Sequence, residues 1–487
     1  MDNFVLISYF ITLSVLFVFG SYGFVMMYYH RKYGNIKQKS DDQLNKNASV
    51  TIQLPLYNEL YVVKRLIDSV CKIDYSKDRL EIQVLDDSTD ETKNIVAEIV
   101  AEKLKEGFDI KQIRRINRKG FKAGALREGL RTAKGEFIAI FDADFLPKKD
   151  FLKKTLSFFS DEKVGMVQTR WEHLNGDYSI LTKAQALALD GHFVIEQNVR
   201  NKAGFFINFN GTGGIWRKCC IEDAGNWQDD TLTEDLDLSY RAQLNGWKFI
   251  FLNDFTSPAE LPSEINALKT QQFRWTKGAI ETAKKILPLV WKSNEPLRIK
   301  LLSTFHLTNN IVFPFILLTA ILNVPLIFIK NSGSHDLYFG VLSVFVLAFI
   351  SSFLFYLYAQ KDIRSDWRKT IVLYPLFLAG SMGFAVNNSR AVFEGLLNRK
   401  SEFVRTPKFK VVSSKDTWAD KKYLTKKIDA SVLIELIMAV YSFIGIVSSI
   451  YFLEIAALPF QLLFFIGFSF VSITSLRHTF SKKIASG

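Results

Sequence analysis

Long apolar segments without charge are the strongest constraint on how this chain can fold. Residues 4–29 hold no charged side chain, and similar runs recur after residue 300. At about 1.5 Å of rise per residue, roughly 20 such residues are enough for a helix to cross a lipid bilayer. Residues 33–300 are charged and mixed in composition. The pattern predicts a membrane protein that has one soluble domain set between its membrane helices.

The charged flanks of these runs predict their direction, because cytoplasmic loops are enriched in Lys and Arg. Residues 1–32 are expected to form an N-terminal membrane helix whose basic end, His30-Arg31-Lys32, is cytoplasmic. Residues 398–430 hold ten Lys or Arg against four Asp or Glu, and residues 361–369 are also basic, so both should lie inside. The later apolar runs are Leu301–Ile329, Leu337–Gln360, Thr370–Ser389, Leu436–Leu453 and Ile455–Leu476.

The segment between the two basic loops must then enter and leave on the same side of the membrane. Residues 370–397 contain Pro375, Asn387 and Arg390, a mixture typical of an interfacial or re-entrant segment and not of a lipid-facing span. We therefore expect five spans in all, about four of them in a membrane domain over residues 301–487. The soluble domain is expected to face the cytoplasm from a plasma (inner) membrane.

Overall charge and cysteine content fit this placement. The net charge is +13, from 62 Lys and Arg against 49 Asp and Glu. Basic flanks facing anionic lipid explain this excess better than a nucleic-acid partner does, so no nucleic acid is expected to bind. The three cysteines, Cys71, Cys219 and Cys220, have no CxxC spacing and form no disulfide framework, which fits a reducing compartment.

The soluble domain, expected over residues 45–265, alternates β-rich and helical segments. Strands are predicted at 49–55, 81–86, 137–141 and 164–168, and helices at about 59–71, 90–105, 120–133 and 150–159. This alternation is typical of an α/β domain with a mostly parallel sheet covered on both faces. No GxGxxG follows the first strand and no P-loop motif occurs, so a dinucleotide reductase or a P-loop ATPase is unsupported.

Acidic pairs fall at the carboxyl ends of two predicted strands, where parallel sheets bind ligands. Asp142 and Asp144 could hold one divalent cation together with the phosphates of a substrate. A solvated turn is the alternative, since Asp235-Leu236-Asp237 repeats the same spacing elsewhere. Asp86-Asp87 could accept hydrogen bonds from a nucleoside, while capping of the next helix by Ser88 or Asp90 is equally open.

Three further motifs each allow a functional and a structural interpretation. Lys119–Gly124 begins a helix, and a lysine beside a helix N-terminus could bind a diphosphate. The alternative is that it is an ordinary surface lysine. Thr233-Glu234-Asp235 begins another helix, in which one of the two acids could be a general base. Alternatively, Thr233 caps the helix and the acids interact favourably with its dipole. Gln271–Trp275 lies in residues 266–300, predicted as amphipathic interface helices, where Arg and Trp could anchor the helix or contact a phosphate and a sugar.

The order Asp-Asp, Asp-x-Asp, Thr-Glu-Asp, Gln-x-x-Arg-Trp resembles the membrane-embedded processive branch of glycosyltransferase family 2. That branch includes cellulose, hyaluronan, mannan and glucomannan synthases. The resemblance covers about residues 1–430. Val167–Trp171 and Phe209–Arg217 are most similar to plant-type mannan and glucan synthase-like proteins. Glu402–Lys408 is similar to the family's cytoplasmic gating loop, which places a gating-loop-like segment at residues 398–428.

The resemblance implies a GT-A nucleotide-sugar-binding fold, an inverting displacement and a Mg²⁺ or Mn²⁺ cofactor. The implied catalytic base is Asp235. The implied donor site is Asp86, Asp87, Lys122, Asp142 and Arg274, and the implied metal site is Asp142 and Asp144, with Asp144 the stronger candidate for direct ligand. The implied acceptor site is Phe209, Asn210, Gly211, Thr212, Glu234 and Trp275. The implied gating-loop residues are Phe403, Thr406 and Lys408.

The expected function is therefore transfer of a hexose from a nucleotide sugar to a growing β-linked glycan that is extruded across the membrane. UDP-glucose is the favoured donor, GDP-mannose is possible, and a β-1,4 linkage is expected. A non-processive ceramide- or diacylglycerol-type glucosyltransferase is the alternative, because it would share the Asp motifs and Gln-x-x-Arg-Trp. A non-catalytic transporter or receptor would explain the spans but not the acidic motifs.

Overall fold

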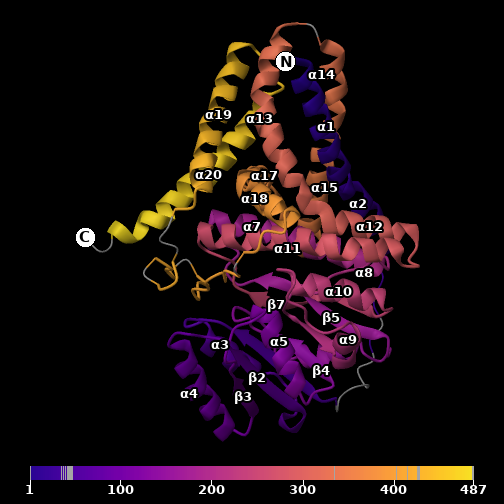
Figure 1. Ribbon diagram of the computed structural model, residues 1–487, viewed down its shortest axis with the longest axis vertical. Helices are drawn as coiled ribbons and strands as arrows, with labels where there is room; N and C mark the ends of the chain where they lie inside the picture. Colours follow the sequence, from indigo (N-terminus) through magenta and orange to yellow (C-terminus); the bar gives the residue numbers. More distant parts are fainter. Residues whose placement is uncertain are drawn as a thin grey trace.

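The computed structural model describes residues 2–34, 36, 38, 40, 48–333, 335–401, 403–413, 415–419, 421–424 and 428–484. A domain built on a β-sheet lies at one end of the molecule, and long apolar helices rise from the other (Figure 1). Between them, helices α7 (Ile180–Asp190), α11 (Ile265–Lys292) and α12 (Leu297–Thr308) run across the long axis as a separating layer. This arrangement of an α/β domain beside apolar helices agrees with the predicted fold class.

The sheet has seven strands in the order β3-β2-β1-β4-β6-β5-β7. Strands β1 to β4 are Val50–Leu56, Leu80–Asp86, Asp109–Ile113 and Phe137–Ile140; strands β5 to β7 are Val164–His173, Gly214–Arg217 and Lys248–Ala259. All neighbours pair in parallel except β6, which runs antiparallel to β4 and β5. The predicted mostly parallel sheet is confirmed, and four of its strands match the predicted segments. Strands β3, β6 and β7 were not predicted from the sequence.

Helices cover both faces of the sheet and close its core. Those of the sheet domain are α3 (Val63–Val70), α4 (Thr92–Lys105), α5 (Phe121–Thr132), α6 (Phe151–Leu156), α9 (Lys218–Asp223) and α10 (Glu234–Leu244), with a short turn of helix η1 (Lys77–Arg79). Every residue of β4 is buried, which explains why its sequence is a continuous apolar run and not an alternating one. Strand β2 is also buried throughout, although it contains the polar residues Glu81, Gln83 and Asp86. One core cluster contains Ile52, Leu66 and Val84, and the opposite one contains Leu126 and Ile138.

Five described helices are long and apolar enough to cross a membrane. They are Asp2–Tyr33, Leu297–Asn331, Asp336–Ile363, Ser431–Tyr451 and Leu458–Phe480. Their component elements are α1 (Asp2–Gly20), α2 (Tyr22–Tyr33), α12, η3 (Asn309–Ile311), α13 (Val312–Asn331), α14 (Asp336–Leu342), η4 (Ser343–Phe345), α15 (Val346–Ile363), α19 (Ser431–Tyr451) and α20 (Leu458–Ile484). The number agrees with the predicted five spans, and the chain is a multi-pass membrane protein.

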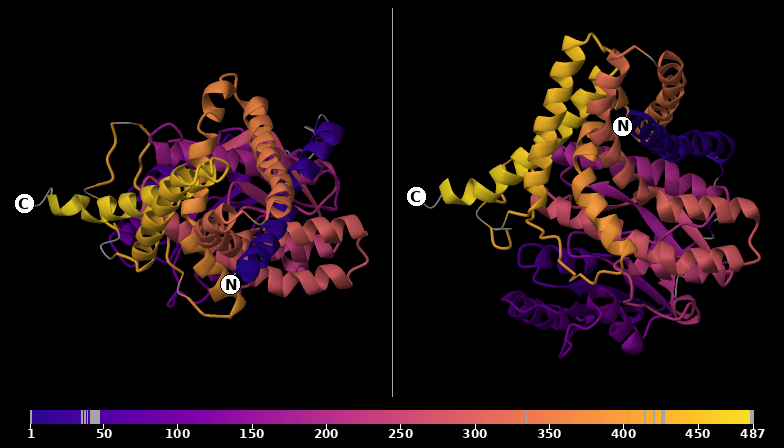
Figure 2. Two further views of the ribbon diagram at one scale, coloured as in Figure 1. Left: turned by 90° about the horizontal axis from the view of Figure 1, so that it is seen from above. Right: turned by 45° about the horizontal axis from the view of Figure 1, so that its top comes forward.

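The predicted re-entrant segment is a broken helix. It comprises α16 (Trp367–Ile371), α17 (Tyr374–Gly383) and α18 (Ala385–Leu396), and the axis bends by 46° between Trp367–Gly383 and Ala385–Leu396. Helix α18 packs along α11, while α17 packs on α20. Figure 1 shows this segment low among the apolar helices, next to the separating layer, and the right-hand view of Figure 2 shows the same segment with the top of the molecule turned forward. If the bent pair were a single span, the number of spans would be six.

One element at the separating layer is unusual. Helix α7 continues into a π-helix, η2 (Gly191–Gln197), and then into α8 (Asn198–Lys202). Such wide turns are rare and are frequently found at functional sites.

Candidate active site

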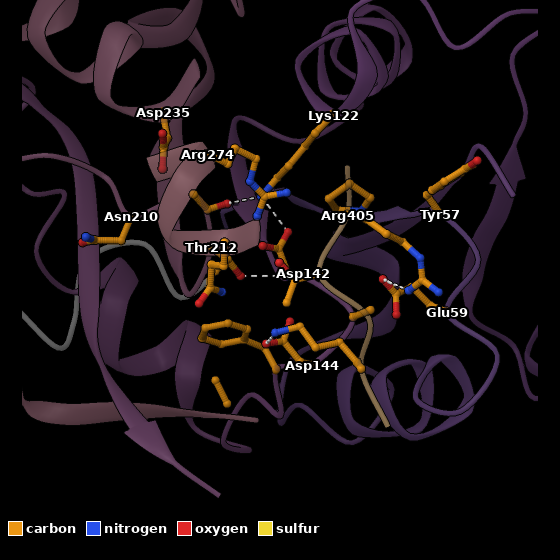
Figure 3. A pocket seen from close by; sticks show the side chains of 18 of the residues that line it. Tyr57, Glu59, Lys122, Asp142, Asp144, Asn210, Thr212, Asp235, Arg274 and Arg405 are labelled. Carbon is orange, nitrogen blue, oxygen red and sulfur yellow. Dashed lines mark hydrogen bonds and ion pairs between the residues drawn. The ribbon is translucent and has the colours of Figure 1, made fainter. Parts of the chain in front are cut away.

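A cavity opens at the carboxyl ends of β1, β2 and β4, beneath α11, and the described part of the 398–428 segment forms one of its walls (Figure 3). All the predicted site residues except Asp86 and Phe209 line it. They are Asp87, Lys122, Asp142, Asp144, Asn210, Gly211, Thr212, Glu234, Asp235, Arg274, Trp275, Phe403, Thr406 and Lys408. Residues separated by more than 300 positions in the sequence therefore share one site.

Two carboxylates stand directly after β4, and a lysine pairs with each of them. Asp142 Oδ1 lies 2.6 Å from Lys122 Nζ, and Asp144 Oδ2 lies 2.6 Å from Lys408 Nζ. The backbone N–H of Asp142 donates to Thr212 Oγ1 at 2.8 Å, which fixes the turn after the strand. Burial raises the pKa of Asp142, and the neighbouring Asp144 adds to the rise although Lys122 opposes it.

The same two carboxylates suit a divalent cation that arrives with a substrate. Within the described ranges, no group of three or more His, Cys, Asp or Glu could hold a metal ion. Mg²⁺ and Mn²⁺ do not need such a group when a substrate supplies phosphate oxygens, because one or two carboxylates then complete the coordination. The lysine ammonium on each carboxylate shows that Asp142 and Asp144 already attract cations. Their chemistry fits a metal bound together with a diphosphate.

Lys122 lies at the beginning of α5 and points across the cavity. Its Nζ donates to the carbonyl oxygen of Gly211 at 2.9 Å besides pairing with Asp142. Burial disfavours the charged amine, but the nearby carboxylates, first among them Asp142, raise the pKa of Lys122 above its usual value. Gly120 precedes the helix with φ of 71°, a conformation that favours glycine. The turn thus delivers an ammonium group and the N-terminus of a helix to the same place, a combination that suits a diphosphate.

Glu234 and Asp235 occupy the first turn of α10 and face the cavity together. Burial and the adjacent Glu234 raise the pKa of Asp235 to about 7, and burial also raises the pKa of Glu234. Gly211 lies against this pair with φ of 79°, and a Cβ atom there would come within 3.0 Å of Asp235 Oδ2. Only a glycine therefore leaves the Asp235 carboxylate room to face a bound hydroxyl. A carboxylate with a pKa near neutrality is suited to accept a proton.

The second Asp-x-Asp spacing has a structural role. Asp237 is buried and pairs with Arg241 at 2.7 Å and with Lys285 at 3.0 Å. It does not line the cavity, in contrast to Asp235 two residues earlier. Thr233 stands at the N-cap of α10, but its hydroxyl lies 3.0 Å from the hydroxyl of Thr282 and does not cap the helix.

Of the two acids that close β2, only Asp87 reaches the cavity. Asp86 is buried and accepts hydrogen bonds from the backbone N–H of Ser88 at 2.9 Å and from Gln112 Nε2 at 2.7 Å. Its carboxylate is occupied in shaping the turn. Asp87 lines the cavity and accepts from Arg115 Nε at 3.0 Å. The structure thus brings one of the two implied nucleoside contacts to the site.

The implied acceptor residues also separate into lining and supporting positions. Phe209 is buried in the core, 5.5 Å from Trp216 between ring centroids, and does not line the cavity. Asn210 does, and its side chain is oriented by the π-helix η2. Gln197 Nε2 donates to Asn210 Oδ1 at 2.9 Å, and His192 Nε2 lies 3.1 Å from Asn210 Nδ2. This contact explains why the rare helix lies beside the site.

Helix α11 and the 398–428 segment cover the cavity from above. Arg274 and Trp275 of α11 line it, and the Arg274 guanidinium lies 4.4 Å from the centre of the Phe403 ring. Phe403 in turn stacks on Phe121, with 5.5 Å between centroids. Glu402, the first residue of the gating-loop-like motif, lies outside the described residues. The loop residues that the resemblance singled out are therefore placed inside the site.

Several lining residues were missed by the sequence reasoning. Glu260, at the end of β7, accepts from the backbone N–H groups of Phe409 and Val411 at 3.1 Å each, and so fastens the 398–428 segment to the sheet. Glu59 lies 3.1 Å from Arg405, and burial raises the pKa of Glu59 to about 8. Glu59 follows the first strand, so the strand-end rule that selected Asp87 could have selected it. Tyr57, Arg118, Trp171 and His173 also line the cavity.

Comparisons with known proteins point in one direction. The family model described as Glycosyltransferase like family 2 matches residues 48–278. Probable glucomannan 4-beta-mannosyltransferase 4 of Oryza sativa subsp. japonica is 42% identical over 280 residues, which is 55% of this chain and 50% of that protein. Glucomannan 4-beta-mannosyltransferase 1 of Cyamopsis tetragonoloba is 37% identical over 390 residues, 77% of this chain and 70% of that protein. The match thus spans about half the length of the rice relative and more than two thirds of the other.

Among solved structures, a mannosyltransferase from Pyrobaculum calidifontis, in complex with GDP-Man and Mn²⁺, has the same fold. It aligns with a TM-score of 0.55 over 80% of this chain and the whole of that one, at 18% sequence identity. At this identity the likeness concerns the fold alone.

Proposed function

The chain belongs to glycosyltransferase family 2, in its membrane-bound cellulose synthase-like branch, and we propose on this premise that it transfers mannose from GDP-mannose to a growing β-1,4-linked glycan. The sequence motifs favoured UDP-glucose as the donor. Both plant relatives are mannosyltransferases by name, which favours GDP-mannose for this chain. UDP-glucose is the second donor to test.

The placement of Asp235 is the observation that carries the proposal. Its carboxylate shares one cavity with the Asp142 and Asp144 pair and with Lys122. In Figure 3, Asp235 and Asn210 lie on one side of Asp142, while Tyr57 and Glu59 lie on the other. The cavity therefore has an acceptor end beside Asp235 and a nucleoside end beside Tyr57, with the phosphate-binding groups between them.

The transfer step follows from this order. The acceptor hydroxyl oxygen bonds to the anomeric carbon of mannose from the face opposite the diphosphate, while the bond from that carbon to the diphosphate oxygen breaks and the configuration inverts. The hydroxyl proton passes to the Asp235 carboxylate and later to water. Lys122 and Arg274 offset the negative charge that grows on the departing GDP. Asp142 and Asp144 would hold a divalent cation, which adds electrostatic stabilisation of the same charge when it is bound.

The membrane helices support a further part of the proposal, namely that the domain faces the cytoplasm of the plasma (inner) membrane and that the product is extruded. Trp275 and Gln271 of α11 line the cavity at its acceptor end, and α11 lies directly beneath the apolar helices. A polymer that grows at this end is next to the bilayer as it lengthens. The basic loops at 361–369 and 398–430 support the cytoplasmic placement.

A donor panel tests the proposal. Purified protein in lipid nanodiscs is given GDP-mannose, UDP-glucose, GDP-glucose or UDP-N-acetylglucosamine with Mn²⁺, and nucleotide release and product size are measured together. We expect turnover with GDP-mannose, a long product that an endo-β-1,4-mannanase degrades, and no turnover in excess EDTA. Turnover with UDP-glucose alone would contradict GDP-mannose as the donor. A product of one sugar on a lipid would instead support the glycolipid-synthase alternative.

A further inference from the structure

Among the described residues that line the cavity, the cations have different kinds of partner. Lys122, Arg405 and Lys408 each pair with a carboxylate of the cavity, at 2.6, 3.1 and 2.6 Å respectively. Arg274 donates to the carbonyl oxygen of Val404 at 3.3 Å. The guanidinium of Arg118 makes no ion pair or hydrogen bond with any described residue, and its Nε is buried without a partner.

Aromatic rings hold this guanidinium in place instead. The Arg118 Cζ atom lies 3.3 Å from the centre of the Tyr57 ring, 5.1 Å from that of Phe121 and 6.0 Å from that of Phe403. We call these three rings the aromatic sleeve. Desolvation lowers the pKa of Arg118, as expected for a cation enclosed by rings. A guanidinium stacked on a ring keeps its N–H groups directed outward in its own plane, available to a ligand.

The sleeve lies at the nucleoside end of the cavity. Tyr57 follows β1 and Asp87 follows β2, at the edge of the sheet where nucleotide folds bind the nucleoside. The phosphate-binding groups Lys122 and Asp142 lie between this end and Asp235, with Tyr57 on the far side (Figure 3). The neighbouring Arg115 is already bound to Asp87, whereas the Arg118 guanidinium has no polar partner among the described residues.

We propose that Arg118 recognises the guanine base of the donor, by donating two hydrogen bonds to O6 and N7. The inference rests on the proposed function and adds the residue that selects the nucleotide. The O6 and N7 atoms are adjacent acceptors, and the planar fork of an arginine matches their spacing. Uracil offers O4 beside a C–H group on one side and an N–H donor on the other, so the same fork finds only one acceptor. Arg118 therefore selects GDP-sugars over UDP-sugars.

Nucleotide binding to the full-length protein tests this role. GDP, UDP and 7-deaza-GDP, which lacks the N7 acceptor, are titrated by calorimetry in the presence of Mn²⁺ against wild type, Arg118→Gln and Arg118→Lys. We expect GDP affinity to fall by about 10- to 100-fold in Arg118→Gln, in the range of a lost bidentate base contact. UDP affinity should stay within about twofold, and GDP and 7-deaza-GDP should bind this variant equally well. Arg131→Gln, at an exposed position of helix α5, which follows the turn that contains Arg118, is the matched control.

The second variant keeps the result interpretable if Arg118→Gln unfolds. Arg118→Lys retains the charge and the stem in the sleeve but not the fork, so it should lose the preference for GDP over 7-deaza-GDP while still binding diphosphates. An equal loss for GDP and UDP would show that Arg118 serves the diphosphate and would overturn the proposal. A preference for GDP that survives in both variants would overturn the role of Arg118 alone. A wild type that prefers UDP would overturn this role and the proposed donor together.

Discussion

Lys408 Nζ lies 2.6 Å from Asp144 Oδ2, and each of the two side chains is only about one-tenth exposed. An ammonium from the 398–428 segment therefore rests on the carboxylate that the family resemblance assigns to the metal. Lys408 comes from a segment that Glu260 fastens to the sheet. Because one carboxylate oxygen cannot hold both cations at close range, we expect a metal ion at this site to compete with Lys408 for Asp144.

Removing this competitor should strengthen metal binding. We expect Lys408→Gln to bind Mn²⁺ several-fold more tightly than wild type in the absence of nucleotide, measured as the loss of the free Mn²⁺ signal in electron paramagnetic resonance. Lys415→Gln, an exposed position of the same segment, is the control. Equal or weaker Mn²⁺ affinity in Lys408→Gln would show that the lysine does not compete for the metal site.

Replacement of the proposed base should remove chemistry and leave binding. We expect Asp235→Asn to fold normally and bind GDP as wild type does, but to lose about 10²- to 10⁴-fold in rate, the usual range for a positioned acid or base. Asp237→Asn, two residues away, should instead lower the melting temperature because it leaves Arg241 and Lys285 without their buried partner. If Asp235→Asn kept more than about a tenth of the rate, another group would be taking the proton.

The pH dependence should follow the carboxylate pair. Transfer needs the ionised form of Asp235, so kcat/KM should rise with pH through about 7 and level off above it. Glu234 is a like charge that raises this pKa, and its removal in Glu234→Gln should therefore move the rise to lower pH. The exposed Glu128→Gln is the control for a lost acidic charge. If the midpoint of the pH profile were the same in Glu234→Gln as in wild type, Glu234 would not be raising the pKa of Asp235.

Trp275 and Trp291 lie on the same helix α11 and should respond differently to truncation. Trp275 lines the cavity, where a ring can pack on the C–H face of the acceptor sugar. We expect Trp275→Ala to bind donor and release some GDP by hydrolysis, yet to make no polymer. Trp291 is half-exposed and far from the lining, so Trp291→Ala should lower yield while leaving product length unchanged. Polymer of normal length from well-folded Trp275→Ala would contradict the prediction that the Trp275 ring packs on the acceptor sugar.

Membrane topology can be tested with single cysteines and an impermeant maleimide on sealed cells. We expect Ser332→Cys to label from outside, and Ser365→Cys and Lys415→Cys to label only after permeabilisation. The native cysteines belong to the sheet domain and serve as an internal control for sealed membranes. External labelling at position 415 would mean that residues 367–396 cross the bilayer and that the 398–428 segment cannot reach the cavity.

The sequence by itself determined the class of molecule. Uncharged runs of about 20 residues can satisfy their backbone as helices in lipid, so composition indicates where the spans lie, and the basic loops predict which runs cross. Continuous apolar segments such as Phe137–Ile140 form buried parallel strands for a similar reason, and the acids that follow them must lie at one edge. The family assignment from motif order is confirmed by the relatives. Strand β3 was missed because Asp109–Ile113 is short and polar at an edge of the sheet.

Only the tertiary structure decided which members of each motif reach the site. Asp86 and Asp87 are neighbours in sequence, yet successive strand residues point to opposite sides, so one is buried in the turn and the other lines the cavity. The same spacing brings both Asp142 and Asp144 to the cavity, whereas in the second Asp-x-Asp it brings Asp235 to the cavity and Asp237 to a buried ion pair. Contacts such as Lys408 on Asp144, and Arg118 within its aromatic sleeve, join residues far apart in the chain. No local pattern encodes such contacts, because they depend on how the folded elements pack against one another.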